Sequence, residues 1–338
     1  MKITVLLLVF SIYFSTECKA QQSSKDPLDI IFSSSYKHYI ISKGDNRPDF
    51  DRRKDSIDLF LISLHNGISP EQFKRKAGWS DEKLQANTKF LIQKGWLARE
   101  NDSLFPTVFI ASKRDGKALS EYAKPVAEEI AASIEDNVPS IKGKFTDKGL
   151  GAKYDFNSLS FLILSDVLLD NWQIMEMESA FLKQENRPQR HGKFYYAAIE
   201  ESSPGGNEPF NIYGNQYGKI NDSIYLSIYG NNRIAANEKL KNNKSFRDSV
   251  LTFSLKLTPA LYKFFDEVSA GYRPELLRIL EAQREYSMKV FQMTGYAGKI
   301  RFEEFFIWWY HFIYTSATNI LARKNIIYIP PDGNFYYK

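Results

Sequence analysis

The stretch Leu91–Leu119, LIQKGWLARENDSLFPTVFIASKRDGKAL, decides how the N-terminal half of this chain is expected to fold. Gly95 ends a helix that enters the stretch, because glycine readily adopts the left-handed conformation that closes helices. Residues 96–99 and Leu104–Ala111 are rich in apolar and aromatic side chains and predict two strands joined by a polar turn. Lys113–Ile134 then predicts a long helix.

Three shorter helices are predicted upstream of this stretch. The first has apolar residues at the i, i+3, i+4, i+7 spacing of one helix face over residues 57–64. The second begins at Ser69 with Pro70 in the first helical position, and the third begins at a capping residue, Ser80.

The order of these elements, three helices, a hairpin and a further helix, resembles the winged helix-turn-helix superfamily over residues 56–134. A helix that ends in Lys-Gly, a strand with a basic residue, a polar wing and the pattern Ser112-x-x-x-Gly116-x-x-Leu119 carry the resemblance. It implies a winged-helix-like domain at residues 56–138, and DNA binding is the usual task of that fold.

The charges on the surfaces that would contact DNA argue against that task. Asp81 and Glu82 open the helix that would read the bases, and the wing tip Arg99–Asp102 carries more acid than base. Phosphate binding needs a concentrated positive surface, whereas the chain has 45 Lys+Arg against 40 Asp+Glu. We therefore expect a packing or protein-binding module. A DNA-binding regulator is an alternative only if the N-terminal signal is misread.

The first 20 residues have the three regions of a secretory signal peptide. Lys2 precedes an apolar run of 11 residues, Thr4–Phe14, and Cys18-Lys19-Ala20 places small residues before a cleavage site. The run is shorter than the ~20 apolar residues of a membrane span, and the residues before the cysteine do not fit lipid attachment. We expect cleavage after residue 20, export to the periplasm or secretion, and no transmembrane span afterwards.

The mature chain would contain no cysteine, because Cys18 is the only one. That excludes disulfides, a thiol nucleophile and a thiolate zinc site. Aromatic residues make up 15% of the chain, enough for a large core. Residues 21–55 are polar and weakly periodic, and we expect a linker with a short ordered stretch near Tyr36–Ile41.

The second half of the chain predicts a mainly helical domain over residues 153–338, with a small antiparallel sheet. A loop between the domains is predicted at residues 138–152, which contain Pro139 and three glycines. Phe302–Lys324 predicts a last helix, followed by a C-terminal hairpin. The strands of the sheet are predicted at Lys193–Glu201, Phe210–Tyr213 and Ser223–Tyr229. The fold class expected for the whole chain is α+β.

A cluster of polar residues in this half is the candidate site. Asp166 and Asp170 lie four residues apart on one face of an apolar helix, so they need partners when buried. Arg187, Arg190 and His191 follow the next helix and are the candidate partners. The remaining candidates lie at or after two Tyr-Gly turns of the predicted sheet and would add aromatic walls and polar donors: Tyr213, Asn215, Tyr229, Asn231 and Arg233.

Three interpretations of this cluster are open: a closed ion-pair network, a pocket for a polar organic ligand such as a sugar, peptide or carboxylate, and a hydrolytic site. A hydrolase, or a divalent metal site, would use Asp166, Asp170 and His191. The sequence has no phosphate loop, dinucleotide motif, His-Glu-x-x-His or Gly-x-Ser-x-Gly. We therefore expect an exported binding protein without cofactor or metal, whose partner is a small polar ligand or a protein. An envelope hydrolase is the alternative.

Overall fold

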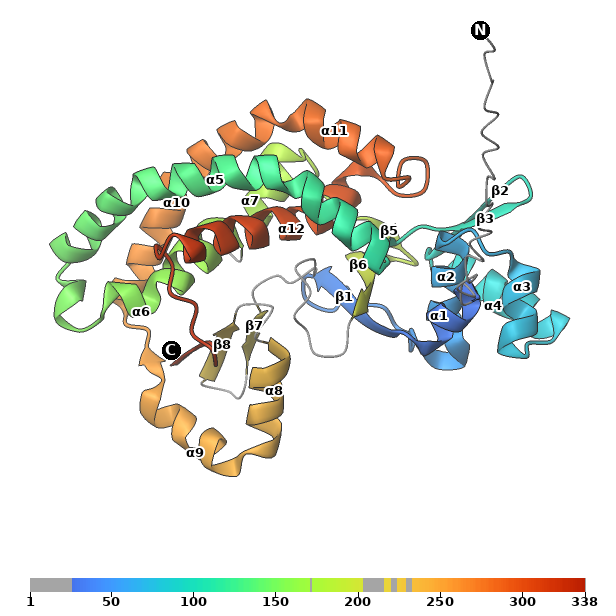
Figure 1. Cartoon of the computed structure of the whole chain (residues 1–338), viewed down its shortest axis with the longest axis horizontal. Coiled ribbons are helices and arrows are strands. Elements are labelled where there is room, and N and C mark those ends of the chain that lie inside the picture. The colour runs from blue at the N-terminus through green and yellow to red at the C-terminus, as the bar shows by residue number, and fades with distance from the viewer. Residues whose placement is uncertain (1–25, 171, 203–215, 220–223, 229–232, 338) are drawn as a thin grey trace, which may run out of the picture.

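The computed structural model describes residues 26–170, 172–202, 216–219, 224–228 and 233–337. Helices dominate, and a small sheet lies between an N-terminal group of helices and a larger group of long helices (Figure 1). The α+β class expected from the sequence is confirmed.

The N-terminal helices begin at the caps that the sequence indicates. Ser69 and Gln72 form a reciprocal capping box, and Ser80 accepts a hydrogen bond from the backbone N–H of Lys83. The predicted helices and hairpin are confirmed as α2 (Ile57–His65), α3 (Pro70–Ala77), α4 (Asp81–Gln93), β2 (Leu97–Glu100) and β3 (Ser103–Pro106).

Residues 26–55, expected to be a linker with a short ordered stretch near Tyr36–Ile41, form part of the folded structure; the ordered stretch lies in β1. They contain α1 (Pro27–Ser33), β1 (Ser35–Ser42) and the start of η1 (Lys54–Ser56). β1 pairs antiparallel with β6 (Lys193–Ser202) over its whole length. The side chains of β1 are mostly half-buried, which explains why the sequence shows only a weak apolar pattern here.

The central sheet is built around β6. β1 pairs with one edge of β6, and β4 (Phe109–Ala111) pairs in parallel with the other. The short β5 (Gln189–Arg190) pairs with the first residues of β6. The stretch 104–111, predicted as one strand, is therefore divided between β3 in the hairpin and β4 in this sheet.

The two faces of β6 belong to two hydrophobic cores. Tyr195, Ala197 and Ile199 pack into what we call the N-terminal core, with α1–α4 and the hairpin. Tyr196 and Ala198 pack into the helical core on the other side. Side chains alternate along a strand, so one strand is a wall of both cores. The N-terminal core is thus not closed by residues 56–138 alone, as the predicted domain division would require.

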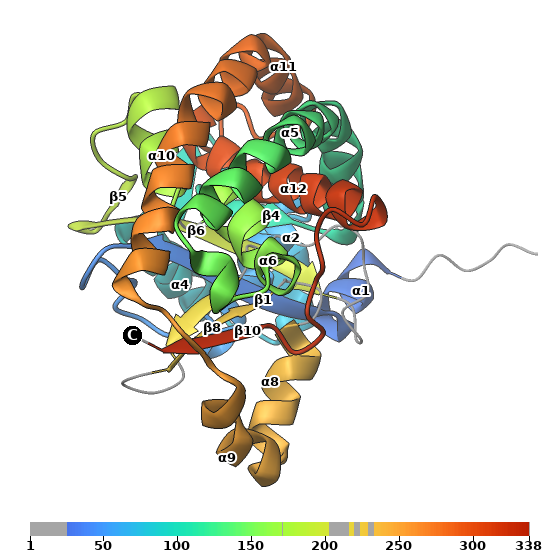
Figure 2. The same ribbon diagram turned by 90° about the vertical axis from the view of Figure 1, so that its left-hand side faces the viewer.

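Four long helices form most of the helical core. α5 packs along α12, and α10 packs against α5 (Figure 2). The aromatic run Phe305–Tyr310 of α12 is buried throughout. Among the described helices, none combines the length and apolar character needed to cross a membrane. These helices are α5 (Lys113–Asp147), α10 (Pro259–Ala282), α11 (Arg284–Met293) and α12 (Phe302–Arg323).

The loop expected at residues 138–152 is largely helical, because α5 continues through Pro139 to Asp147. Ile134, Ile141 and Phe145 are buried on both sides of the proline. Their packing outweighs the cost of about 3 kcal/mol that a proline imposes inside a helix. After α5 only the short η2 (Leu150–Ala152) separates it from the next helix.

The predicted helices after residue 153 contain π-helical turns. α6 (Phe156–Phe161) continues as the π-helix η3 (Leu162–Val167), and α7 (Ile174–Glu176) continues as the π-helix η4 (Met177–Phe181). Such turns are rare and occur often at functional sites.

The C-terminal hairpin predicted from the sequence is wrong. Residues 325–329 form no strand, and β10 (Asn334–Tyr337) pairs instead with β8, antiparallel, and with β9, parallel. The predicted strand Phe210–Tyr213 lies outside the described residues. α8 and α9 lie at the end of the molecule opposite α11 (Figures 1 and 2). The remaining elements are β7 (Gln216–Lys219), β8 (Ile224–Ile228), α8 (Arg233–Asn242), α9 (Lys244–Phe253) and β9 (Leu255–Lys256).

Candidate functional site

The two candidate aspartates are buried in the helical core. Asp166 lies in the π-helix η3 and accepts a hydrogen bond from the hydroxyl of Ser227. Asp170 follows η3 and lies beside Tyr314 of α12. Burial raises the pKa of the Tyr314 phenol well above its ordinary value, and the Asp170 carboxylate raises it further. Asp166 thus has a neighbour on β8, and Asp170 has one on α12.

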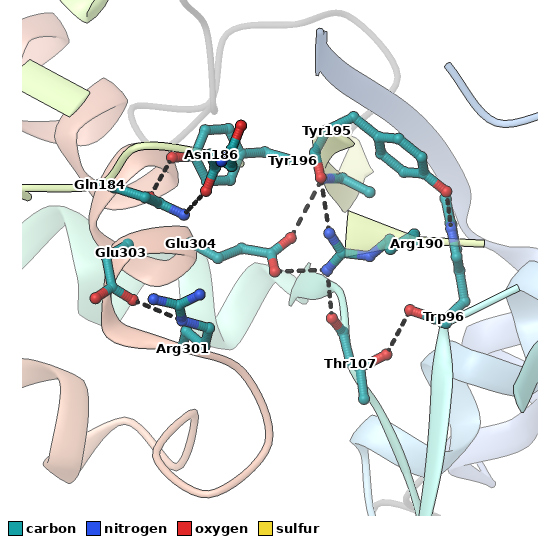
Figure 3. Close-up of polar contacts among 12 residues, drawn as sticks. Trp96, Thr107, Gln184, Asn186, Arg190, Tyr195, Tyr196, Arg301, Glu303 and Glu304 are labelled. Atoms are coloured by element: carbon teal, nitrogen blue, oxygen red, sulfur yellow. Dashed lines mark hydrogen bonds and ion pairs between the residues drawn. The ribbon is translucent and has the colours of Figure 1, made fainter. Parts of the chain in front are cut away.

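Arg190 was expected to pair with these aspartates, but it pairs with Glu304 (Figure 3). Its Nη2 donates to Glu304 Oε2 at 2.5 Å and to the carbonyl of Thr107 at 2.7 Å. Its Nη1 donates to the carbonyl of Tyr195 at 2.7 Å. Glu304 and Tyr314 are ten residues apart on α12, about 15 Å along the helix axis. Arg190 therefore contacts α12 near its start, whereas Asp170 lies beside a residue of α12 about three turns further along the helix.

The Arg190–Glu304 pair is sealed from solvent. The side chains of Arg190 and Glu304 are 4% and 2% exposed. Burial raises the pKa of the Glu304 carboxyl above its usual value, although Arg190 and the N–H of Ala197, which Glu304 also binds, partly offset this effect. The pair joins α12, β5 and the segment between β3 and β4, which identifies it as a structural connection.

His191 does not join either aspartate. It forms the tight turn between β5 and β6 with Gly192, and both residues have positive φ values, 48° and 77°. Such a turn matches the twist of a hairpin, and it leaves His191 exposed. In the part of the chain that the structure describes, no three His, Cys, Asp or Glu side chains are placed to hold a metal ion. Asp166, Asp170 and His191 therefore form no metal site among the described residues.

Arg187 has a different environment from Arg190, although only three residues separate them. Its Nε and Nη2 donate to the two oxygens of Glu178 at 2.6 Å and 3.0 Å, a bidentate pair. Both side chains are 11% exposed. The third nitrogen, Nη1, is buried without a hydrogen-bond partner among the described residues. An unpaired buried donor is unfavourable, so this N–H is a point where an acceptor would be stabilised.

Arg187 lines a partly open pocket of about 200 Å³. We call it the Arg187 pocket, and it is lined by Lys43, Asn46, Glu178, Gln184, Glu185, Asn186, Arg187, Phe194 and Tyr196. The ring of Tyr196 lies 5.7 Å from the Arg187 guanidinium, and its hydroxyl donates to Gln184 Oε1 at 2.7 Å. Gln184 in turn donates to the carbonyl of Asn186 at 2.7 Å (Figure 3).

The Arg187 pocket combines an aromatic wall with several polar groups. Burial, followed by the nearby Glu178 carboxylate, raises the pKa of the Tyr196 phenol, so this group stays neutral and can hydrogen-bond. Lys43 and Arg187 provide positive charge, while Glu178 is already engaged with Arg187 and Glu185 is exposed. Pockets with few, well-placed polar groups against an aromatic wall are typical of small-molecule sites.

The other residues predicted for the site were expected around the two Tyr-Gly turns. Arg233 is the first residue of α8. Four of them lie outside the described residues: Tyr213, Asn215, Tyr229 and Asn231.

Sequence reasoning missed the two carboxylates that pair with the arginines. Glu304 had a recognisable signal, since it is an acid inside the apolar stretch Phe302–Tyr310 and therefore needs a buried cation. Glu178 had a weaker signal, because Glu176 and Ser179 make its stretch, nine residues before Arg187, only partly apolar.

No family model, no curated protein and no solved structure matches this chain.

Proposed function

We propose that this protein is an exported binding protein that holds a small polar molecule with a carboxylate group in the Arg187 pocket. The observation that carries the proposal is that Arg187, which lines a polar pocket, has a buried Nη1 without a partner among the described residues. A ligand carboxylate would accept from this N–H and from Lys43.

The remaining lining groups favour a ligand with hydrogen-bond donors as well. The carboxylate of Glu185 can accept such donors. The amide oxygens of Asn46 and Gln184 already accept from the Phe194 N–H and the Tyr196 hydroxyl, and each has a second lone pair for a ligand donor. The rings of Phe194 and Tyr196 offer an apolar wall. An amino acid or a sugar acid has this combination of groups.

The test is calorimetric titration with L-glutamate and gluconate as probes and glucose as a neutral comparison. Arg187→Lys keeps the positive charge beside Glu178 but removes the planar fork and Nη1. We expect at least a tenfold weaker binding of the acidic probes. Arg284→Lys is the control, because Arg284 forms a similar bidentate pair with Glu281 outside the pocket. Equal affinities in both variants, or no binding by any probe at millimolar concentration, would contradict the proposal.

Export rests on the signal-peptide pattern of residues 1–20. We expect the mature protein to begin at Gln21 and to be recovered outside the cytoplasm. Mass spectrometry of the native N-terminus after cell fractionation checks both points. An intact Met1 in the cytoplasm would contradict export while leaving the ligand test unaffected.

The winged-helix resemblance supports a packing role for residues 56–134. The element order matches, but the last helix, α5, packs against α12 in the helical core. Asp81 and Glu82 are exposed at the start of α4, where a DNA-reading helix would contact the duplex. We therefore propose that this module builds the frame behind the pocket and does not read DNA.

A further inference from the structure

We infer that a second groove, next to the Arg190–Glu304 pair, binds an amphipathic anion, meaning a carboxylate or phosphate head joined to an apolar body. The groove has a volume of about 570 Å³ and lies between the β2–β3 hairpin, β5 and the loop before α12. It shares no lining residue with the Arg187 pocket. This inference therefore does not depend on the proposed function.

Positive charge gathers on one wall of the groove. Lys299 and Arg301 line it, and Lys299 forms no ion pair within the described residues. Arg301 pairs with Glu303, but this pair is exposed and therefore weak. The one carboxylate that lines the groove, Glu304, is already bound by Arg190. An anionic head placed here meets two cations and no free acid.

Two further features of this wall favour an anion. α12, a helix of 22 residues, begins at Phe302 without a side-chain cap from Arg301. Glu303 and Glu304 in its first turn already offset part of its dipole, so its contribution beside the groove is its uncapped first N–H groups. Arg190, whose side chain is 96% buried, also lines the groove, and its Nε has no partner among the described residues.

The groove also has apolar lining. Leu97 and Ala98 of β2, together with Pro188 and Ile300, contribute to it. The volume is much larger than a carboxylate or phosphate group needs, and the extra space is bordered by these four side chains. An apolar chain attached to the anionic head would bury surface here and gain affinity in proportion to that area.

The test uses dodecanoate and dodecyl phosphate below their critical micelle concentrations, with dodecyltrimethylammonium as a cationic comparison. We expect both anions to bind in calorimetric titration and the cation not to bind. Affinity should rise about two- to fourfold for each methylene added from octanoate to dodecanoate. The relative affinity of the two anions tells whether the head is a carboxylate or a phosphate.

Matched variants locate the binding. Replacing Lys299 and Arg301 together by Gln should weaken dodecanoate binding at least tenfold. The control replaces two exposed residues outside the groove by Gln and should leave dodecanoate binding unchanged. They are Lys289, which has no ion pair among the described residues, and Arg278, which pairs with Glu275.

Three results would overturn the inference. The first is equal binding of the cationic detergent, and the second is equal loss of binding in the control variant. The third is binding of acetate and inorganic phosphate as tight as that of the long-chain probes. Arg187→Lys should leave dodecanoate binding intact, so a failure of this inference is distinguishable from a failure of the proposed function.

Discussion

Arg187 and Arg190 lie on the same short segment, yet their surroundings differ. Arg190 donates to one carboxylate and two backbone carbonyls and is almost fully buried. Arg187 has one carboxylate partner, lines a pocket, and has a buried Nη1 without a partner among the described residues. Both Nη atoms of Arg190 have acceptors from the protein and only its Nε lacks one, so Arg190 holds elements together, whereas Arg187 leaves a terminal nitrogen for which a ligand could provide the acceptor.

The largest expected effect is on stability. It should differ between the two variants in which a carboxylate that pairs with Arg190 or Arg187 is replaced. Glu304→Gln leaves the buried Arg190 charge uncompensated, and we expect it to lower the free energy of unfolding by about 3–5 kcal/mol. Glu178→Gln, in the less buried pair, should cost about 1–3 kcal/mol. Urea unfolding of both variants measures the difference. Equal losses would show that Arg190 and Arg187 have the same structural role.

As the pH is lowered, the protein should lose stability in the helical core before ligand binding in the Arg187 pocket weakens. Burial lowers the pKa of His311 on α12 to about 4. Between that value and the ordinary 6.5 the unfolded chain binds a proton that the folded chain does not, so stability falls as the pH drops through this window. The loss from this group should reach about 3 kcal/mol near pH 4.

Urea unfolding at several pH values, compared between the wild type and His311→Phe, isolates this contribution. Below pH 6.5, the free energy of unfolding of the His311→Phe variant should fall less steeply with decreasing pH than that of the wild type. Ligand binding by Arg187 should persist at pH 5.5, because arginine stays charged. Identical slopes in the two proteins would show that His311 is not the group that titrates.

A smaller effect concerns the contact between Gly95 and Arg190. Gly95 has a φ of 70°, and a methyl group there would lie 3.3 Å from Cγ of Arg190. Gly95→Ala should therefore cost about 2–3 kcal/mol, from backbone strain and from displacement of the arginine. Gly78→Ala is the matched control, since Gly78 has a φ of 65° and open space around it. It should cost only the strain, about 1–2 kcal/mol.

The smallest expected effect is on nucleic acid. We expect duplex DNA to show no sub-micromolar binding to this protein in a fluorescence anisotropy titration at physiological salt. The exposed Asp81 and Glu82 place negative charge where phosphates would lie. Tight binding with a steep dependence on salt would show that the N-terminal region, and not the pocket, is the functional site.

The sequence was informative where the signal is local. Caps such as Ser69 and Ser80 predicted the helix starts, and the polar loop with Arg187 and Arg190, which the sequence singles out, lines the pocket and the groove described above. Their partners could not be predicted in the same way. Glu304 lies 114 residues after Arg190 in sequence, and only the packing of α12 against the sheet brings it there.

The same reason explains the errors in the fold. The pairing of β1 with β6 joins residues about 160 positions apart, so neither strand shows its partner in the local pattern. Pro139 predicts a loop when only the neighbouring sequence is considered, but the packing of the buried residues around it keeps α5 helical. Propensity is a weak signal that tertiary contacts can override.

Because β6 is a wall of both cores, the chain cannot complete its N-terminal core in the order in which it is synthesised. Ala111, the last residue of β4, leaves the ribosome about 80 residues before Lys193, the first residue of β6. At 5–20 residues per second this is a delay of roughly 4–16 s. During that time β1 has no partner strand, and the apolar side chains that later meet Tyr195 and Ile199 are uncovered. A fragment that ends after α5 should therefore aggregate, and the smallest unit that can fold extends at least to residue 202.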